Sequence, residues 1–213
     1  MIRAMRRQMP LQAPPAHLLD GASLFLDLDG TLVEFAQDPD GIHVCDRLRG
    51  LLLELSRRLD GRLAVISGRS LDDLAGHLDL PDLPIAGSHG AERRLADGKV
   101  EGTESGTEIA EAVREGTEFA PARALPVATK RFAANLARRH DLQVQKGQMV
   151  RELRRPGRNK GDVVRLYMED EPFRNGRPVM IGDDVTDEDA FAAVNDLGGA
   201  SILVGNDRPT LAQ

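Results

Sequence analysis

Five short apolar runs, most of them separated by helical patterns, constrain how this chain can fold more than any other feature. The runs are Leu24–Leu28, Leu63–Ile66, Pro84–Gly87, Pro178–Ile181 and Ser201–Val204. Strands that alternate with helices favour a parallel sheet with helices packed against its faces. The sequence therefore predicts an α/β fold built on a parallel sheet.

Three helices are predicted between or after these runs. The first has leucines at helical spacing, and Gly61 follows it as a stop signal. The second begins at Lys160, and the third begins after Thr186, whose hydroxyl can cap its first turn. The residues predicted to face the core are Leu48, Leu51, Leu52, Leu55 and Leu59 in the first helix, Val163, Leu166 and Tyr167 in the second, and Ala190, Phe191 and Val194 in the third.

Residues 93–157 interrupt this alternation and predict an inserted domain. Near-repeats of Glu, Gly and Thr over residues 97–118 indicate polar loop with one brief helix. An apolar helical face follows at Lys130–Arg139, and residues 142–145 and 149–153 alternate with a period of two, as an antiparallel pair would. An elaborate surface excursion is the alternative, although so long a connection without structure would be unusual. We therefore expect a flexible tail (residues 1–20), a core (residues 21–92 and 158–213) and a small inserted α/β cap domain (residues 93–157).

Two carboxylates, Asp27 and Asp29, end the first apolar run immediately before Gly30. A buried, unpaired Asp27 would cost several kcal/mol, and a divalent cation with a phosphate would remove that cost. Side chains two positions apart on a strand face the same way, so one carboxylate can attack phosphorus while the other handles a proton. The alternative is that both are turn or capping residues at a strand end. The motif favours phosphoryl transfer through an aspartyl intermediate.

Other polar residues follow the apolar runs, and ligands of open parallel sheets bind beyond the carboxyl ends of the strands. Ser67 and Arg69 offer a hydroxyl and a cation to a phosphate, or form a capped turn. His89 lies in a turn with two glycines and is either a ligand-facing or a structural residue. Lys160 is unfavourable at a helix start unless it has a partner such as Asp27 and a phosphate; otherwise it is a surface lysine.

Residues 183–189 hold five acidic side chains in seven positions. Asp183 and Asp184 come directly after a buried strand, where oxygen ligands for Mg²⁺ would be needed. Acidic residues in a first helical turn are ordinary, so the run is informative only together with Asp27 and Asp29. In that combination the sequence predicts a magnesium site.

The amino-acid composition limits the classes of molecule that the chain is expected to bind. The net charge of -6 and the 3% of aromatic residues, with no Trp, argue against a nucleic-acid surface. No apolar run approaches membrane-spanning length, so we expect no membrane partner and a cytoplasmic location. Cys45 is the single cysteine, which excludes an intramolecular disulfide, and we expect it to be a small buried residue. The oligomeric state stays open.

Four segments, taken in order, resemble the motifs of the haloacid dehalogenase superfamily of phosphohydrolases. They are Asp27-Leu28-Asp29-Gly30-Thr31, Ile66-Ser67-Gly68-Arg69, Lys160-Gly161 and Gly182 to Asp189. Longer strings, Gly87 to Glu92, Glu152 to Gly161 and Gly182 to Phe191, resemble the trehalose-6-phosphate phosphatase family. The resemblance implies a Rossmann-like core with an inserted α/β cap, Mg²⁺ as cofactor and a small sugar phosphate, trehalose 6-phosphate, as substrate.

The same resemblance implies roles for individual residues. The implied catalytic residues are Asp27 as nucleophile, Asp29 as general acid/base, and Ser67 and Lys160 as phosphate-holding groups. The implied metal ligands are Asp27, the backbone carbonyl of Asp29, and Asp183, with Asp184 and Asp187 as near neighbours. The substrate-binding candidates are Arg69, His89, Arg123 and Glu152, the last expected to hydrogen-bond a glucose hydroxyl.

The predicted cap departs from the family pattern. The stretch between Glu92 and Glu115 is shorter than in family members, Glu115 stands where the family has a lysine, and Pro121 interrupts an expected strand that retains Arg123. The sequence also stops at Gln213, soon after the last predicted strand, where the family pattern implies a closing helix. Two alternatives follow: a phosphatase for another sugar phosphate, of the sucrose or mannosyl-glycerate type, or a weakly active sugar-phosphate-binding homologue.

Overall fold

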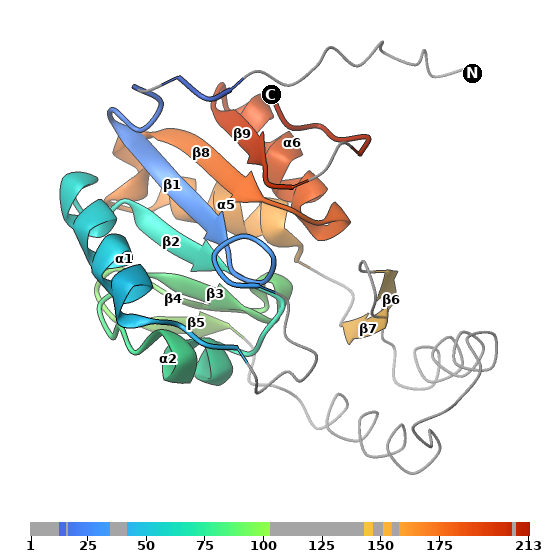
Figure 1. Ribbon diagram of the computed structural model, residues 1–213, viewed down its shortest axis with the longest axis horizontal. Helices are drawn as coiled ribbons and strands as arrows, with labels where there is room; N and C mark the ends of the chain where they lie inside the picture. Colours follow the sequence, from blue (N-terminus) through green and yellow to red (C-terminus); the bar gives the residue numbers. More distant parts are fainter. Residues whose placement is uncertain are drawn as a thin grey trace.

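The computed structural model describes residues 13–15, 17–34, 42–102, 143–146, 151–154, 158–205 and 208–213. Its main element is a seven-stranded sheet with the strand order β5-β4-β3-β2-β1-β8-β9 (Figure 1). The strands are β1 (Ala22–Asp27), β2 (Leu63–Ile66), β3 (Ile85–Gly87), β4 (Glu92–Arg94), β5 (Val100–Gly102), β8 (Arg177–Gly182) and β9 (Ala200–Leu203). Strands β3, β2, β1, β8 and β9 are parallel, while β4 and β5 pair antiparallel. The predicted α/β fold is confirmed.

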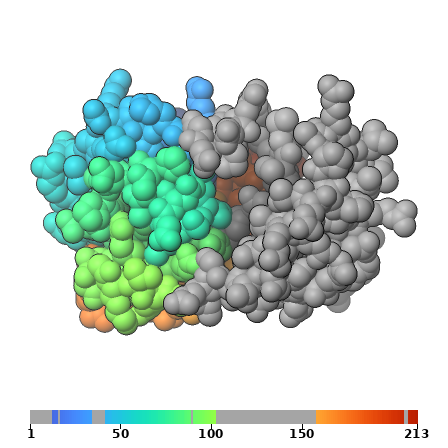
Figure 2. All heavy atoms as spheres, turned by 90° about the horizontal axis from the view of Figure 1, so that it is seen from below, coloured from blue at the N-terminus to red at the C-terminus, as the bar shows by residue number. Residues whose placement is uncertain are grey.

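Helices cover both faces of this sheet. The first face carries α1 (Asp46–Arg58) and α2 (Leu71–Leu78), and the second carries α5 (Lys160–Glu169) and α6 (Glu188–Asp196). Figure 2 shows α1 and α2, cyan to green, at the outer surface.

The sheet has a hydrophobic core on each face, and side chains of β1 contribute to both cores. Leu24 packs with α1 and α2, whereas Phe25 packs with α5 and α6. Because side chains alternate along a strand, Asp27 lies on the same side as Phe25, toward the helix that begins with Lys160. Alternation in β1 therefore aims the candidate nucleophile at the candidate phosphate-binding lysine.

Several shorter elements complete the description. They are the 3₁₀ turns η2 (Ser88–Gly90), η3 (Phe173–Asn175) and η4 (Val185–Asp187), and a separate two-stranded sheet of β6 (Gln143–Lys146) and β7 (Arg151–Arg154). The antiparallel pairing of β6 with β7 confirms the predicted pair. No helix among the described residues is long and apolar enough to cross a membrane.

The sheet extends further along the chain than the predicted core. Strand β4 spans the expected core–cap boundary at residues 92 and 93, and β5 lies where a polar loop was expected. Strand β4 pairs with β3 and β5 pairs with β4, so both extend the main sheet at this edge. The helix expected over residues 130–139 lies outside the described residues. The cap as a domain stays a prediction.

Some predicted burial patterns are wrong in detail. Leu51 is 51% exposed, because the buried face of α1 is centred on Leu52. In α5, Leu166 was expected to be buried but is only half-buried. Val164 is buried instead. Cys45 is exposed at the start of α1 rather than buried.

The expected flexible tail ends earlier than residue 20. Leu18 is buried in the core against the first face of the sheet. The guanidinium of Arg177 donates to the Leu18 carbonyl at 3.1 Å, which ties this turn to the start of β8. Residues 17–20 therefore belong to the core.

Candidate active site

The ends of β1 and β8 and the start of α5 bring a lysine and three aspartates together. Asp27 is the last residue of β1 and is 4% exposed. Lys160 is the first residue of α5 and is 3% exposed. Its Nζ lies 2.5 Å from Asp27 Oδ1. The sequence predicted this pairing from the unfavourable position of a lysine at a helix start.

The start of α5 is fixed locally, which holds Lys160 in place. Asn159 and Asp162 form a reciprocal capping box around the first turn. Gly161 allows α5 to approach α6 closely, since a Cβ there would lie 2.3 Å from the Asp189 carbonyl oxygen. The capped turn and the close helix contact leave Lys160 facing the sheet.

Asp187 links Lys160 to the turn that follows β8. Its Oδ1 accepts from Lys160 Nζ at 2.6 Å, and its Oδ2 accepts from the backbone N–H groups of Asp183 and Asp184, each at 3.0 Å. Gly182 makes room for this carboxylate, because a Cβ would lie 2.5 Å from it. Both oxygens of Asp187 are thus already hydrogen-bonded, so Asp187 positions Lys160 and the turn in addition to any role as a metal ligand.

The residues that cap the turn after β8 differ from the capping residue predicted from the sequence. Asp184 and Asp187 form a capping box around η4, and α6 begins only at Glu188. Thr186, predicted to cap the helix, lies inside the 3₁₀ turn and does not. The carboxylates of Asp184 and Asp187 accept from backbone donors of η4, whereas the N-cap residue of α6, Asp187, makes no side-chain cap hydrogen bond to that helix.

Burial and charge shift the ionisation of this group. Burial raises the pKa of Asp27 to about 8 against the attraction of Lys160, and the negative charges of Asp187 and Asp183 add to the rise. Burial lowers the pKa of Lys160, but Asp27 and Asp187 outweigh it and leave that pKa above its ordinary value. Lys160 is therefore charged, while Asp27 needs further positive charge to ionise fully near neutral pH.

The donor set fits a divalent metal ion. One carboxylate oxygen from each of Asp27, Asp183 and Asp187 lies within 4.8 Å of the others. Three carboxylates against one ammonium leave excess negative charge, and burial followed by the charge of Asp187 raises the pKa of Asp183. Asp184 Oδ1 is buried and has no hydrogen-bond partner among the described residues. Carboxylate oxygens in this number and setting suit Mg²⁺.

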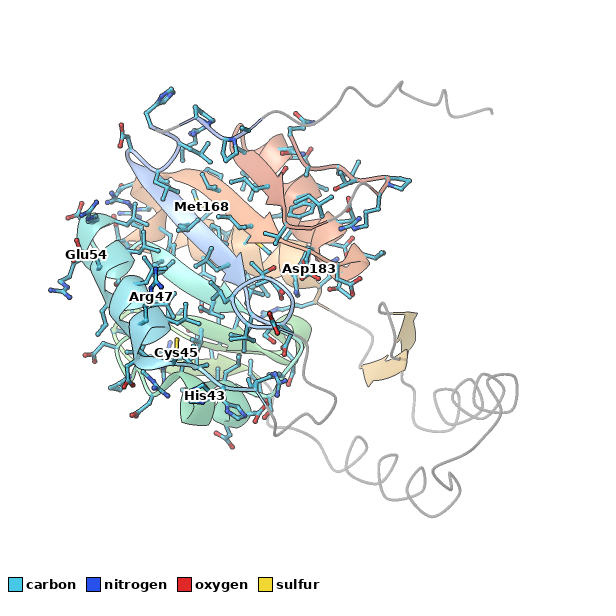
Figure 3. The ribbon with its side chains drawn as sticks, viewed as in Figure 1. His43, Cys45, Arg47, Glu54, Met168 and Asp183 are labelled. Carbon is cyan, nitrogen blue, oxygen red and sulfur yellow. The ribbon has the colours of Figure 1, made fainter. Side chains whose placement is uncertain are left out.

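Asp183 lies beside the loop that follows β1 (Figure 3). Thr31, in that loop, donates its hydroxyl hydrogen to Asp183 Oδ1 at 3.2 Å. Thr31 belongs to the Asp27–Thr31 motif, but no role for its side chain was predicted from the sequence. This hydrogen bond orients Asp183 toward Asp27.

Asp29 is bound by Arg69. Arg69 donates from Nε to Oδ2 at 2.9 Å and from Nη2 to Oδ1 at 2.8 Å. Ser67 Oγ reaches the same carboxylate at 3.4 Å, and Arg69 also pairs with Asp73 at 2.9 Å. Arg69, predicted to bind the substrate, thus contacts the predicted general acid/base in this structure.

For the remaining predicted site residues, the structure describes at most the position of the backbone. His89 lies in η2 between β3 and β4, and Glu152 lies in β7, but the side chains of both are outside the described set. Arg123 is outside the described residues altogether. Arg208, which contacts the turn at Asp183, was missed, because no motif marks it in the sequence.

The fold is that of haloacid dehalogenase-like hydrolases. A solved haloacid dehalogenase-like hydrolase from B. subtilis shares the fold, with a TM-score of 0.59 at 14% identity over 87% of this chain and 90% of that chain.

The chain belongs to the trehalose-phosphatase family, whose model matches residues 25–118 and 118–210. It is 38% identical to a probable trehalose-phosphate phosphatase of Sinorhizobium fredii, over 88% of this chain and 79% of the relative. It is 37% identical to trehalose-6-phosphate phosphatase of Escherichia coli, over 85% and 76%. The crystal structure of a trehalose-6-phosphate phosphatase related protein superposes with a TM-score of 0.71 at 26% identity, covering 87% of each chain. The family resemblance predicted from the motifs is confirmed.

Proposed function

We propose that this chain is a Mg²⁺-dependent phosphatase that hydrolyses trehalose 6-phosphate to trehalose and phosphate through an aspartyl-phosphate intermediate. The observation that carries the mechanism is the buried contact of Asp27 with Lys160 beside Asp183. The names of the relatives at 37–38% identity support the substrate. Mg²⁺, when bound by Asp27 and Asp183, would neutralise the carboxylates and polarise the phosphoryl group.

In the first step, Asp27 attacks phosphorus and the bond between phosphorus and the sugar oxygen breaks. Protonated Asp29 gives its proton to the departing sugar oxygen, so that trehalose leaves neutral. Lys160 and Ser67 hold the phosphoryl oxygens during the transfer. Arg69 keeps the Asp29 carboxyl group at the end of β1, where it can reach the leaving oxygen.

In the second step, a water molecule attacks the phosphorus of the acyl phosphate. Asp29, now a carboxylate, takes the proton from this water, and the bond between phosphorus and Asp27 breaks. Inorganic phosphate leaves, and both aspartates return to their starting state. One group thus serves as acid and then as base, which requires that its position be fixed between the steps.

The inserted segment supplies the sugar recognition in this proposal. Glu152 in β7 accepts hydrogen bonds from a glucose hydroxyl, and Arg123 contributes a further polar contact. His89, which lies in η2 of the core, adds a polar contact from outside this segment. A sheet-domain site that binds only the phosphate cannot distinguish one sugar phosphate from another. Specificity for the disaccharide therefore has to come from the segment between β5 and α5.

Phosphate release from a panel of sugar phosphates tests the proposal. The panel contains trehalose 6-phosphate, sucrose 6-phosphate, mannosylglycerate phosphate, glucose 6-phosphate and an aryl phosphate, each measured with and without Mg²⁺. We expect the highest kcat/KM for trehalose 6-phosphate and no turnover without the metal. A higher kcat/KM for another sugar phosphate would reassign the substrate, and no release from any of them would reject the phosphatase function.

A further inference from the structure

The turn that follows β8 is held from both sides of its backbone. The N–H groups of Asp183 and Asp184 donate to Asp187, and the carbonyl oxygens of the same two residues accept from the guanidinium of Arg208. Arg208 Nε lies 3.2 Å from the Asp183 oxygen, and Nη2 lies 2.7 Å from the Asp184 oxygen. The backbone N–H and C=O groups of two consecutive residues are thus all hydrogen-bonded.

Arg208 is itself held in place by α6. Its Nη1 donates to Glu188 Oε1 and to the Pro209 carbonyl oxygen at 3.1 Å. Glu188 also accepts from Thr210 Oγ1 at 2.8 Å and from the backbone N–H of Leu211 at 2.6 Å. The side chains of Arg208 and Glu188 are both 19% exposed, so solvent competes little for these bonds.

The C-terminal residues anchor this arrangement to the sheet. The backbones of Gln213 and Ser201 exchange two hydrogen bonds of 3.1 Å, which adds a short extended segment beside β9. Ala212 is buried in the core between the sheet and α6, and Asn195 donates to the Leu211 carbonyl oxygen at 2.7 Å. A segment that follows β9, 25 residues after Asp183, therefore delivers a cation to the backbone of the turn at Asp183.

We propose that Arg208 is a positioning residue that fixes the Asp183–Asp184 turn for metal binding, an inference that rests on the proposed function. A carboxylate ligand binds a metal tightly only when its backbone holds it near the required geometry, because each misplaced ligand must be reordered on binding. The guanidinium fork suits two adjacent carbonyl oxygens, since its N–H groups diverge in a fixed plane. Removing it takes one hydrogen bond from each carbonyl oxygen. The Asp184 oxygen keeps only the backbone N–H of Asp187 at 3.0 Å, and the backbone of the turn then depends mainly on Asp187.

The proposal predicts a change in metal affinity. Arg208→Ala should weaken Mg²⁺ binding by about 10–100-fold, the range typical of residues that orient metal ligands. Excess Mg²⁺ should restore most of kcat, because Arg208 touches neither the substrate nor the reacting atoms. Arg208→Lys should recover part of the affinity, because one ammonium can bind one of the two carbonyl oxygens at a time.

A matched control lies at the opposite end of the sheet. Arg62 is 15% exposed, donates to the Ala22 carbonyl oxygen at 3.2 Å and pairs with Asp60 at 3.4 Å. Its partners are of the same kind as those of Arg208, but they lie at the start of β1, away from the site. Arg62→Ala should therefore leave Mg²⁺ affinity unchanged while causing a comparable loss of thermal stability.

Titration calorimetry with Mg²⁺ alone, followed by kinetics over a range of Mg²⁺ concentrations, decides the question on the full chain. Weaker Mg²⁺ binding in Arg208→Ala and intermediate binding in Arg208→Lys, with unchanged binding in Arg62→Ala, support the proposal. Wild-type Mg²⁺ affinity in a folded Arg208→Ala variant overturns the proposal. If Arg208→Ala does not fold, Arg208→Lys alone decides, and wild-type Mg²⁺ affinity in that variant overturns the proposal. Because the calorimetry uses no substrate, a wild-type chain that binds Mg²⁺ but does not hydrolyse trehalose 6-phosphate would reject the proposed function and not the role of Arg208.

Discussion

Arg69 binds both carboxylate oxygens of Asp29, and this pair joins the residues that follow β2 to those that follow β1. The side chains of Arg69 and Asp29 are 14% and 21% exposed, so water competes weakly for the contact. Arg69 is in turn held by Asp73 in α2. The general acid/base of the proposed reaction is therefore positioned by a neighbouring strand.

Removing this contact should slow turnover more than it weakens binding. In Arg69→Ala the Asp29 carboxylate loses its two-fold hydrogen bond, and a group that is free to rotate transfers protons less often. We expect kcat to fall by about 10²-fold or more with KM changed by less than about 5-fold, within the range of general acid/base contributions. A large rise in KM at unchanged kcat would mean that Arg69 binds the substrate phosphate instead, as the sequence alone suggested.

Replacing the nucleophile should abolish turnover without unfolding the chain. In Asp27→Asn the amide keeps the shape and can still accept from Lys160, but it neither attacks phosphorus nor ligates Mg²⁺ well. We expect phosphate release at assay background and a thermal transition close to that of the wild type. The exposed Asp20, just before β1, provides the control Asp20→Asn, which should keep full activity. Activity above background in Asp27→Asn would exclude the aspartyl intermediate.

Asp187 should be required for both stability and activity. In Asp187→Asn, an amide whose oxygen accepts from the turn presents its NH₂ group to Lys160, so two donors face each other in a buried site. Breaking a buried ion pair costs up to about 3–5 kcal/mol, and the remaining Asp27 contact should reduce that loss. Denaturant unfolding compares this variant with Asp189→Asn, in which an exposed carboxylate of the same acidic run is changed. Equal stability of the two variants would contradict the assigned role.

Mg²⁺ affinity should rise with pH up to about pH 8. The pKa of Asp27 in the metal-free protein is raised to about 8, chiefly by burial, so below that pH a proton occupies the carboxylate that the metal needs. Binding then releases this proton, and affinity should increase by up to about tenfold per pH unit between pH 6 and 8 and level off above. Calorimetry in buffers of different ionisation enthalpy measures both the affinity and the released proton. Affinity that does not change over this range would contradict the raised pKa.

Glu152 tests the predicted sugar contact. If its carboxylate accepts from a glucose hydroxyl, Glu152→Ala should lower kcat/KM for trehalose 6-phosphate by about 1.5–3 kcal/mol, the range for a hydrogen bond to a charged group. Hydrolysis of an aryl phosphate, which lacks the sugar, should hardly change. Equal losses on both substrates would indicate structural damage, and no loss on either would favour a phosphatase for another sugar phosphate.

Sequence pattern by itself determined the sheet and the positions of its polar residues. The apolar runs predicted β1, β2, β3, β8 and β9 within one or two residues at each end. Periodicity is a local property, and the carboxyl ends of parallel strands must meet at one edge. That rule is why Asp27, Ser67 and Asp183 could be grouped from sequence, and why a partner could be expected for Lys160.

Only the tertiary structure determined which of several possible partners each long side chain binds. Arg69 was expected to bind a phosphate, but it binds Asp29. No sequence motif marked Arg208, although it binds the turn at Asp183. The same holds for Asp187, whose two oxygens serve Lys160 and the turn at once. A guanidinium or carboxylate has several rotamers and many chemically acceptable partners. Which one it takes depends on distances between segments that lie far apart in the chain, and local patterns carry no information about those distances.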